Sequence, residues 1–225
     1  MGLQDYKKAG KIAAEALLFG KKLIKEDILL KDVTKKTEEF VYQQGARLAF
    51  PVQISLNNKA AHCYASNDTG EKFKHGDLVK LDVGVHVNGF IGDNALSTNI
   101  ATDDDLELIR ASKDALREAI SLMRPGVKLR EIGKAIEEVI VGYGFNPIRN
   151  LSGHEVDQWN LHAGVIIPNY DNKSETELEE GQVFAVEPFA TTGDGKVNDG
   201  RLSGIYRIQE LKSVRIGRDV LDYVY

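Results

Sequence analysis

The sequence lacks several features that mark other classes of protein. Its single cysteine, Cys63, excludes a disulfide within the chain and favours a reducing compartment. No apolar run approaches the roughly 20 residues that a membrane-spanning helix needs, and the first residues are too polar for a signal peptide. A formal net charge of −5 provides no basic surface typical of nucleic-acid binding. We therefore expect a cytoplasmic protein that binds neither membranes nor nucleic acids.

The 225 residues contain one internal repeat. Residues 31–33 (KDV) recur 99 positions later as residues 130–132 (REI). After a small insertion, residues 76–82 align with residues 181–187, and in both copies an acidic residue stands six places after a glycine. Chance similarity between two amphipathic helices is the alternative, but helical periodicity does not explain an acidic residue at matched spacing.

Each copy is expected to hold two helices followed by strands. The apolar periodicity predicts helices at about 3–24, 31–44, 104–123 and 130–143, and Gly45 and Gly144 are suited to end the second helix of each copy. This order predicts an α+β fold with a pseudo-two-fold duplication and a site at the junction. Because no low-complexity linker separates the halves, about 1–103 and 104–210, we expect one domain over 1–225.

A hairpin in the first half is predicted to bring two aspartates together. Asn88-Gly89 between β-forming residues is typical of a type I′ turn, which fixes the register by counting. Asp82 then faces Ala95 and Asp93 faces Gly84, so both carboxylates project from the same side of the sheet. Gly84 leaves space for something to approach Asp93. The two acids either share a proton or a cation, or they are solvent-facing residues on an exposed sheet.

The second half adds further candidate ligands. His154 lies in a glycine-containing segment that we expect to be irregular, and Glu187 closes the apolar run 183–186. Two aspartates, one glutamate and one histidine suit paired divalent ions such as Mn, Fe, Co or Zn. The set does not resemble a structural zinc site, which would contain several cysteines. His62 and His162 stand at nearly the repeat offset and are either directed at the junction or polar loop residues.

These segments together resemble the methionine aminopeptidases. Residues 81–93 (LDVGVHVNGFIGD) resemble their first metal-binding hairpin, and residues 150–154 (NLSGH), 161–164 (LHAG) and 184–190 (FAVEPFA) resemble their type 2 branch. The resemblance extends over essentially the whole chain. It implies the pita-bread (creatinase/aminopeptidase-like) fold, which has the pseudo-two-fold expected from the repeat.

The resemblance also implies roles for individual residues. The implied metal ligands are Asp82, Asp93, His154 and Glu187, holding two divalent ions (Co, Mn, Fe or Zn). His62 and His162 would contact substrate and polarise the scissile carbonyl, and Phe50 and Leu161 would line the methionine side-chain pocket. The implied reaction is hydrolytic removal of the initiator methionine from nascent proteins.

The sequence departs from this family at one position that matters for the site. The family carries a second glutamate in a Glu-His-Thr triplet on its last strand, and this triplet does not occur here. Glu210 is an alternative ligand, but the segment 211–225 looks more like the start of the type 2 helical insertion. We therefore expect that the C-terminal part of the family's length is missing and that a complementing segment supplies it. A non-catalytic pita-bread binding module and a proline-specific peptidase of the same fold remain the alternatives.

Overall fold

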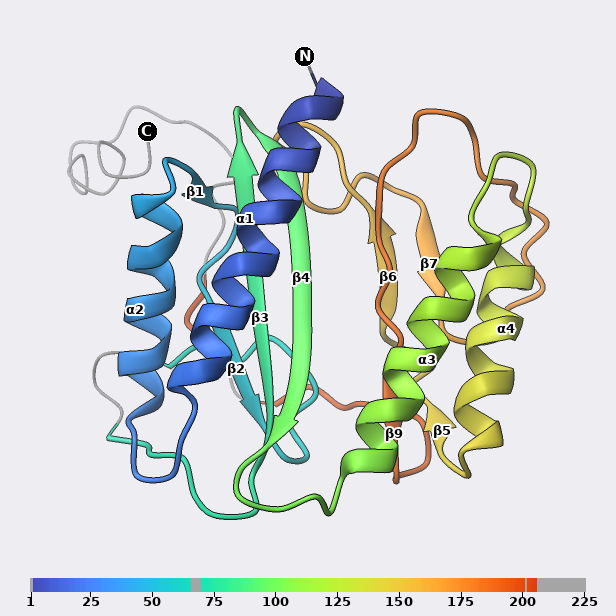
Figure 1. Cartoon of the computed structure of the whole chain (residues 1–225). Coiled ribbons are helices and arrows are strands. Elements are labelled where there is room, and N and C mark those ends of the chain that lie inside the picture. Colours follow the sequence, from blue (N-terminus) through green and yellow to red (C-terminus); the bar gives the residue numbers. More distant parts are fainter. Residues whose placement is uncertain (1, 66–69, 201, 206–225) are drawn as a thin grey trace.

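The computed structural model describes residues 2–65, 70–200 and 202–205, arranged as two halves that lie side by side (Figure 1). In the first half, the elements are α1 (Gly2–Leu23), α2 (Leu30–Gln43), β1 (Arg47–Leu48), β2 (Gln53–Leu56), β3 (Leu78–Val87) and β4 (Phe90–Asn99). In the second half, they are α3 (Leu106–Leu122), α4 (Leu129–Gly142), β5 (Asn146–Pro147), β6 (Ser152–Glu155), β7 (Ile166–Pro168), β8 (Phe184–Ala185) and β9 (Ala190–Thr191). Two helices precede the strands in each half, which confirms the expected α+β order.

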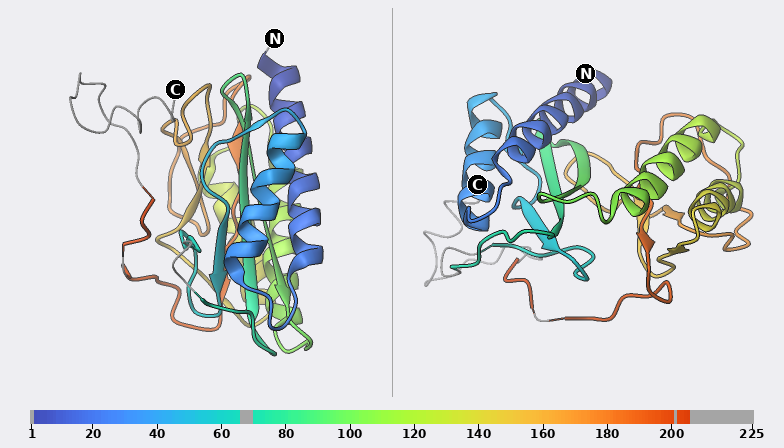
Figure 2. Two further views of the ribbon diagram at one scale, coloured as in Figure 1. Left: turned by 90° about the vertical axis from the view of Figure 1, so that its left-hand side faces the viewer. Right: turned by 60° about the horizontal axis from the view of Figure 1, so that its bottom comes forward.

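The first half is a four-stranded antiparallel sheet covered on one face by α1 and α2 (Figures 1 and 2). The central strand β3 pairs with β4 along one edge and with β1 and β2 along the other. Val79, Leu81, Val83 and Val85 alternate along β3 and are fully buried in the core beneath the helices. The intervening residues of β3, including Asp82, therefore project from the opposite face of the sheet.

The register of the β3–β4 hairpin confirms the prediction made by counting from its turn. Asp82 lies opposite Ala95, and Gly84 lies opposite Asp93. Asn88 and Gly89 have φ values of 53° and 85°, as a type I′ turn requires. Asp82 and Asp93 consequently share the sheet face that the helices leave uncovered.

The second half packs α3 and α4 against short strands. Ile132, Ile136 and Ile140 occur at helical spacing along α4 and are fully buried with Ile167 of β7. The strands form a three-stranded sheet in the order β7-β6-β8 and a separate β5-β9 pair. Both halves thus bury their own apolar core and meet along the edges of their sheets.

The expectation that His154 lies in an irregular segment is wrong, because the residue is part of β6. There it pairs with Ile166 of β7 on one side and with Ala185 of β8 on the other. The neighbouring glycine suggested a loop, but Gly153 instead allows β8 to approach closely: a Cβ atom there would lie 3.0 Å from the Glu187 backbone nitrogen. Gly153 therefore allows close packing of neighbouring strands in the second half.

Two further expectations can be placed against the structure. Glu210 and the segment 211–225 lie outside the described residues. No helix among those that the structure describes is both long enough and apolar enough to cross a membrane.

Candidate metal centre

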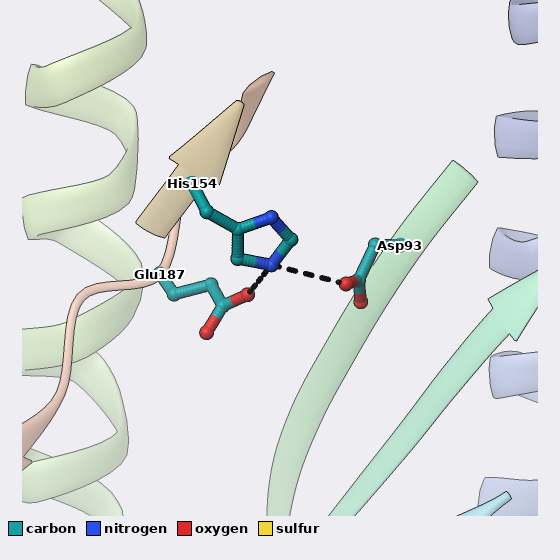
Figure 3. A group of neighbouring side chains, drawn as sticks. All are labelled: Asp93, His154 and Glu187. Carbon is teal, nitrogen blue, oxygen red and sulfur yellow. Dashed lines mark ion pairs between the residues drawn. The ribbon is translucent and has the colours of Figure 1, made fainter. Parts of the chain in front are cut away.

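Three side chains converge where the two halves meet: Asp93 of β4, His154 of β6, and Glu187 from the segment that follows β8 (Figure 3). The Nε2 atom of His154 lies 3.5 Å from Oδ2 of Asp93 and 3.1 Å from Oε1 of Glu187. One ligand atom from each of the three lies within 4.8 Å of the others, a spacing that suits a single metal ion. Asp93 belongs to the first half and the other two residues to the second, so the cluster depends on both halves.

Asp82 lies beside this cluster, on the same sheet face as Asp93. Burial raises the pKa of Asp82 well above its usual range, and the charges of Asp93 and Glu187 raise it further. Its Oδ1 atom is buried and has no hydrogen-bond partner among the described residues. A buried carboxylate oxygen without a partner, set among other carboxylates, is the kind of group that a bound cation satisfies.

The pKa of His154 is raised by its two acidic neighbours. Desolvation alone would lower its pKa, but the carboxylates of Asp93 and Glu187 outweigh burial and raise the pKa to about 10. Burial raises the pKa of Glu187, and the contact with His154 offsets part of that rise. The two carboxylates thus favour a positive charge at the imidazole, and a bound divalent cation would supply that positive charge instead.

The donor set fits intermediate-hardness divalent ions. It offers one imidazole nitrogen and the carboxylates of Asp82, Asp93 and Glu187, and ions such as Mn, Fe, Co and Zn accept this mixture of ligands. With three acids and one histidine, the cluster carries more negative than positive charge even when His154 is protonated. The residues therefore fit a cationic cofactor.

The two histidines that the sequence places near the junction are both close to this cluster. The ring of His162 lies 4.4 Å from the ring of His154, measured between centroids. His62 lies close enough to Glu187 for its charge to lower the pKa of that carboxyl, which opposes the effect of burial. His62 has a left-handed backbone with φ of 60°, and both histidines are exposed, as expected of side chains that reach an accessible site.

Phe50 occupies the space that Gly84 leaves open. A Cβ atom added at Gly84 would clash with the Phe50 ring, so the aromatic ring lies directly against the backbone opposite Asp93. The expectation that Gly84 makes room was correct, but a side chain of this chain takes that room. Phe50 and Leu161 are both half-buried, and Leu161 precedes His162 on the same loop.

The loop that carries Leu161 and His162 is docked onto the β3–β4 turn, a contact that sequence reasoning missed. The backbone N–H of Trp159 donates to the carbonyl of Gly89 at 2.9 Å, and Nε2 of Gln158 donates to the carbonyl of Asn88 at 2.8 Å. The Trp159 ring lies so close to Gly89 that a Cβ atom there would clash with it. The ring also lies 4.8 Å from that of His86. Trp159 is the only tryptophan of the chain, and that rarity was the one available signal.

The comparisons with known proteins agree with this arrangement. The profile described as "Metallopeptidase family M24" matches residues 4–221. A methionine aminopeptidase of Thermococcus onnurineus is 46% identical over 84% of this chain and 64% of its own length. The crystal structure of a methionine aminopeptidase from Thermotoga maritima is 31% identical, with a TM-score of 0.79 over 86% of this chain and 81% of the other. The prolidase from Pyrococcus furiosus is 26% identical, with a TM-score of 0.72 over 83% of this chain and 55% of the other.

The two-half architecture and the cluster of acids and histidine at its junction define a metallopeptidase of the pita-bread fold. The chain belongs to metallopeptidase family M24. It spans 64% of the length of the Thermococcus onnurineus relative and of several other methionine aminopeptidases with similar sequences.

Proposed function

We propose that this chain carries out the metal-dependent hydrolytic removal of N-terminal methionine from nascent proteins. The observation that carries the proposal is the convergence of Asp93, His154 and Glu187 at 3.5 and 3.1 Å, because it brings metal ligands of both halves to one point. The relatives at 36–46% identity that carry the name methionine aminopeptidase favour this substrate over others within the fold. The peptides recognised would be those with an N-terminal methionine.

In this proposal, Asp82, Asp93, His154 and Glu187 hold two divalent ions, which are Co, Mn, Fe or Zn. When bound, the ions supply a water of lowered pKa as the nucleophile. Among the residues of the chain, His62 and His162 would donate hydrogen bonds to the oxygen that becomes negative as the carbonyl is attacked. Their exposure beside the buried ligand candidate His154 supports this division of roles.

The substrate's methionine side chain would rest against Phe50 and Leu161. Phe50 lies against Gly84, opposite Asp93, so an apolar surface borders the metal ligands. Such a surface selects side chains by length and apolar character, although it discriminates only modestly for each methylene. We further propose that residues 1–225 act as one domain with halves of about 1–103 and 104–210, and that it works in the cytoplasm, where the free Cys63 stays reduced.

We also propose that a further polypeptide segment completes the site by pairing with a strand edge at the junction of the two halves. Within the described part of the chain, β4 pairs only with β3 and β8 pairs only with β6. A cavity of about 210 Å³ at the junction is lined by residues 91–94 and 183–185 together with Val156 and with Tyr6 and Gly10 of α1. An unpaired strand edge at the junction is suited to accept a further strand by backbone hydrogen bonding, and an acidic residue on that strand would add a carboxylate to the cluster.

The test is the release of methionine from a Met-Ala-Ser peptide by the purified protein with added Co²⁺ or Mn²⁺, alone and with the C-terminal region of a longer relative supplied separately. Asp93→Asn should abolish release, because the remaining amide binds a cation weakly, while the thermal unfolding midpoint stays similar. Cleavage of X-Pro dipeptides in place of Met-Ala-Ser would identify a proline-specific peptidase. A folded protein that binds neither metal nor peptide in either arrangement would instead be a binding module and would refute the proposal.

A further inference from the structure

Gln53 is a polar residue in a position that the proposed chemistry leaves unexplained. It lies on β2 directly opposite Asp82 of β3 and is 6% exposed. Directly opposed residues of an antiparallel pair share a face, and their Cβ atoms lie roughly 5 Å apart. Gln53 is therefore on the face that carries the metal ligands, beside the carboxylate of Asp82.

Two buried oxygens at this pair have no partner. Within the described residues, neither Oε1 of Gln53 nor Oδ1 of Asp82 has a hydrogen-bond partner. A buried acceptor without a donor typically costs about 1–3 kcal/mol. The nitrogen and oxygen of a carboxamide exchange places when the group rotates by half a turn, and only hydrogen bonding decides between the two orientations. Depending on which way its carboxamide is turned, Gln53 can therefore offer the neighbouring Asp82 either an acceptor or a donor.

We propose that Gln53 is a positioning residue for Asp82, with its Nε2 donating a hydrogen bond to Oδ1 of the carboxylate. This inference rests on the proposed function, since it concerns Asp82 as a metal ligand. The hydrogen bond would hold one carboxylate oxygen and leave the other available as a ligand. Carboxylates that bind metals are commonly held by such outer hydrogen bonds, which fix their orientation.

The neutral charge of Gln53 suits this role. Asp82, Asp93 and Glu187 supply the negative charge that attracts a cation, and a lysine or arginine opposite Asp82 would neutralise part of it. A carboxamide holds the carboxylate without competing with the ion. Ser55, two residues further along β2, shares this face but lies opposite Lys80, so it provides a matched control.

The first experiment uses the metal-free protein and does not depend on the proposed function. In the ¹⁵N-labelled full chain, the side-chain amide of Gln53 is assigned by its loss in Gln53→Met. Asp82→Ala should shift this signal upfield and accelerate its hydrogen exchange, because the acceptor is lost. If the signal is insensitive to Asp82→Ala, the proposed hydrogen bond does not exist and the inference is overturned.

The second experiment measures Co²⁺ binding by calorimetry and by the visible absorption of the bound ion. Gln53→Met should weaken the site that contains Asp82 by roughly 10- to 100-fold and alter its absorption, with little effect on the site of His154. Ser55→Ala should leave both unchanged. Gln53→Glu should also weaken Co²⁺ binding, because a carboxylate at this position repels Asp82. Tighter Co²⁺ binding by this variant would show that residue 53 is itself a ligand and would overturn the inference. If the wild-type chain binds no Co²⁺, the proposed function fails, while the amide signal still decides whether Gln53 bonds Asp82.

Discussion

Gly153 allows β6 to lie directly against the segment that carries Glu187, and replacing it with alanine should disrupt the candidate metal centre. The new methyl group would clash with the carbonyl oxygen of Ala185 and lie only 3.0 Å from the backbone nitrogen of Glu187. Both obstacles are backbone atoms, so no side-chain rotation can relieve the contact. The two segments must therefore move apart, and His154 must move away from Glu187.

The size of this effect follows from the contacts. Relieving the clash requires a displacement on the order of half an ångström, whereas metal–ligand distances tolerate only about 0.2 Å. Overpacking of this kind typically costs about 1–3 kcal/mol in the free energy of unfolding. Gly153→Ala should therefore fold with reduced stability but lose most of its affinity for the ion held by His154 and Glu187.

The assay combines chemical denaturation with calorimetric titration of Co²⁺. Gly142→Ala is the matched control, because a Cβ atom at Gly142, the last residue of α4, would meet no described atom within 4 Å beyond the adjoining residues and backbone of its own helix. That variant should retain Co²⁺ affinity and gain up to about 1 kcal/mol of stability. If Gly153→Ala binds Co²⁺ as tightly as the wild type does, the close approach of β6 and β8 does not set the ligand geometry and the reasoning fails.

Three further predictions concern individual residues of the site. Asp93→Asn should lower Co²⁺ affinity by at least tenfold without loss of folding, and calorimetry that finds unchanged affinity would contradict the ligand assignment. The pKa of His154 is raised to about 10 in the metal-free protein, so binding of an ion at pH 7 should displace a proton from its ring. The apparent Co²⁺ affinity should therefore rise with pH up to about 10. The binding enthalpy at pH 7 should also depend on the ionisation enthalpy of the buffer. Trp159→Ala should reduce methionine release by roughly tenfold or more, because a misplaced loop misaligns His162. The Co²⁺ affinity should stay within twofold of the wild-type value. Equal losses of methionine release and of Co²⁺ affinity would indicate general unfolding.

Much of the site could be predicted because local rules determine it. The Asn88-Gly89 turn fixes the register of the hairpin, and the two-residue period of a strand then places Asp82 and Asp93 on one face. The glycines that end the helices are equally local signals: Gly45 and Gly144 have φ values of 72° and 83°. Neither inference requires knowledge of what packs where.

The remaining features depend on contacts between distant segments. Gly153 predicts a loop by composition, yet its neighbours across the sheet make it part of a strand. The ring of Phe50 fills the space beside Gly84, and nothing in the residues around Gly84 indicates this. The contact between Trp159 and Gly89 likewise joins residues of different halves. Packing of this kind depends on the assembled fold, so the secondary-structure propensities of the individual residues do not predict these contacts.

The internal repeat explains why the two sides of the metal centre differ. His154 lies opposite Ala185, two residues before Glu187, and Ser55 lies opposite Lys80, two residues before Asp82. Since Glu187 and Asp82 are equivalent in the repeat, Ser55 holds the position in the first half that His154 holds in the second. In the proposed two-ion centre, one side would therefore have a nitrogen donor, whereas the other would rely on carboxylate oxygens and on the groups that orient them. An ion beside Glu187 should bind more tightly than an ion beside Asp82, and the hydrogen bond proposed for Gln53 matters most on this weaker side.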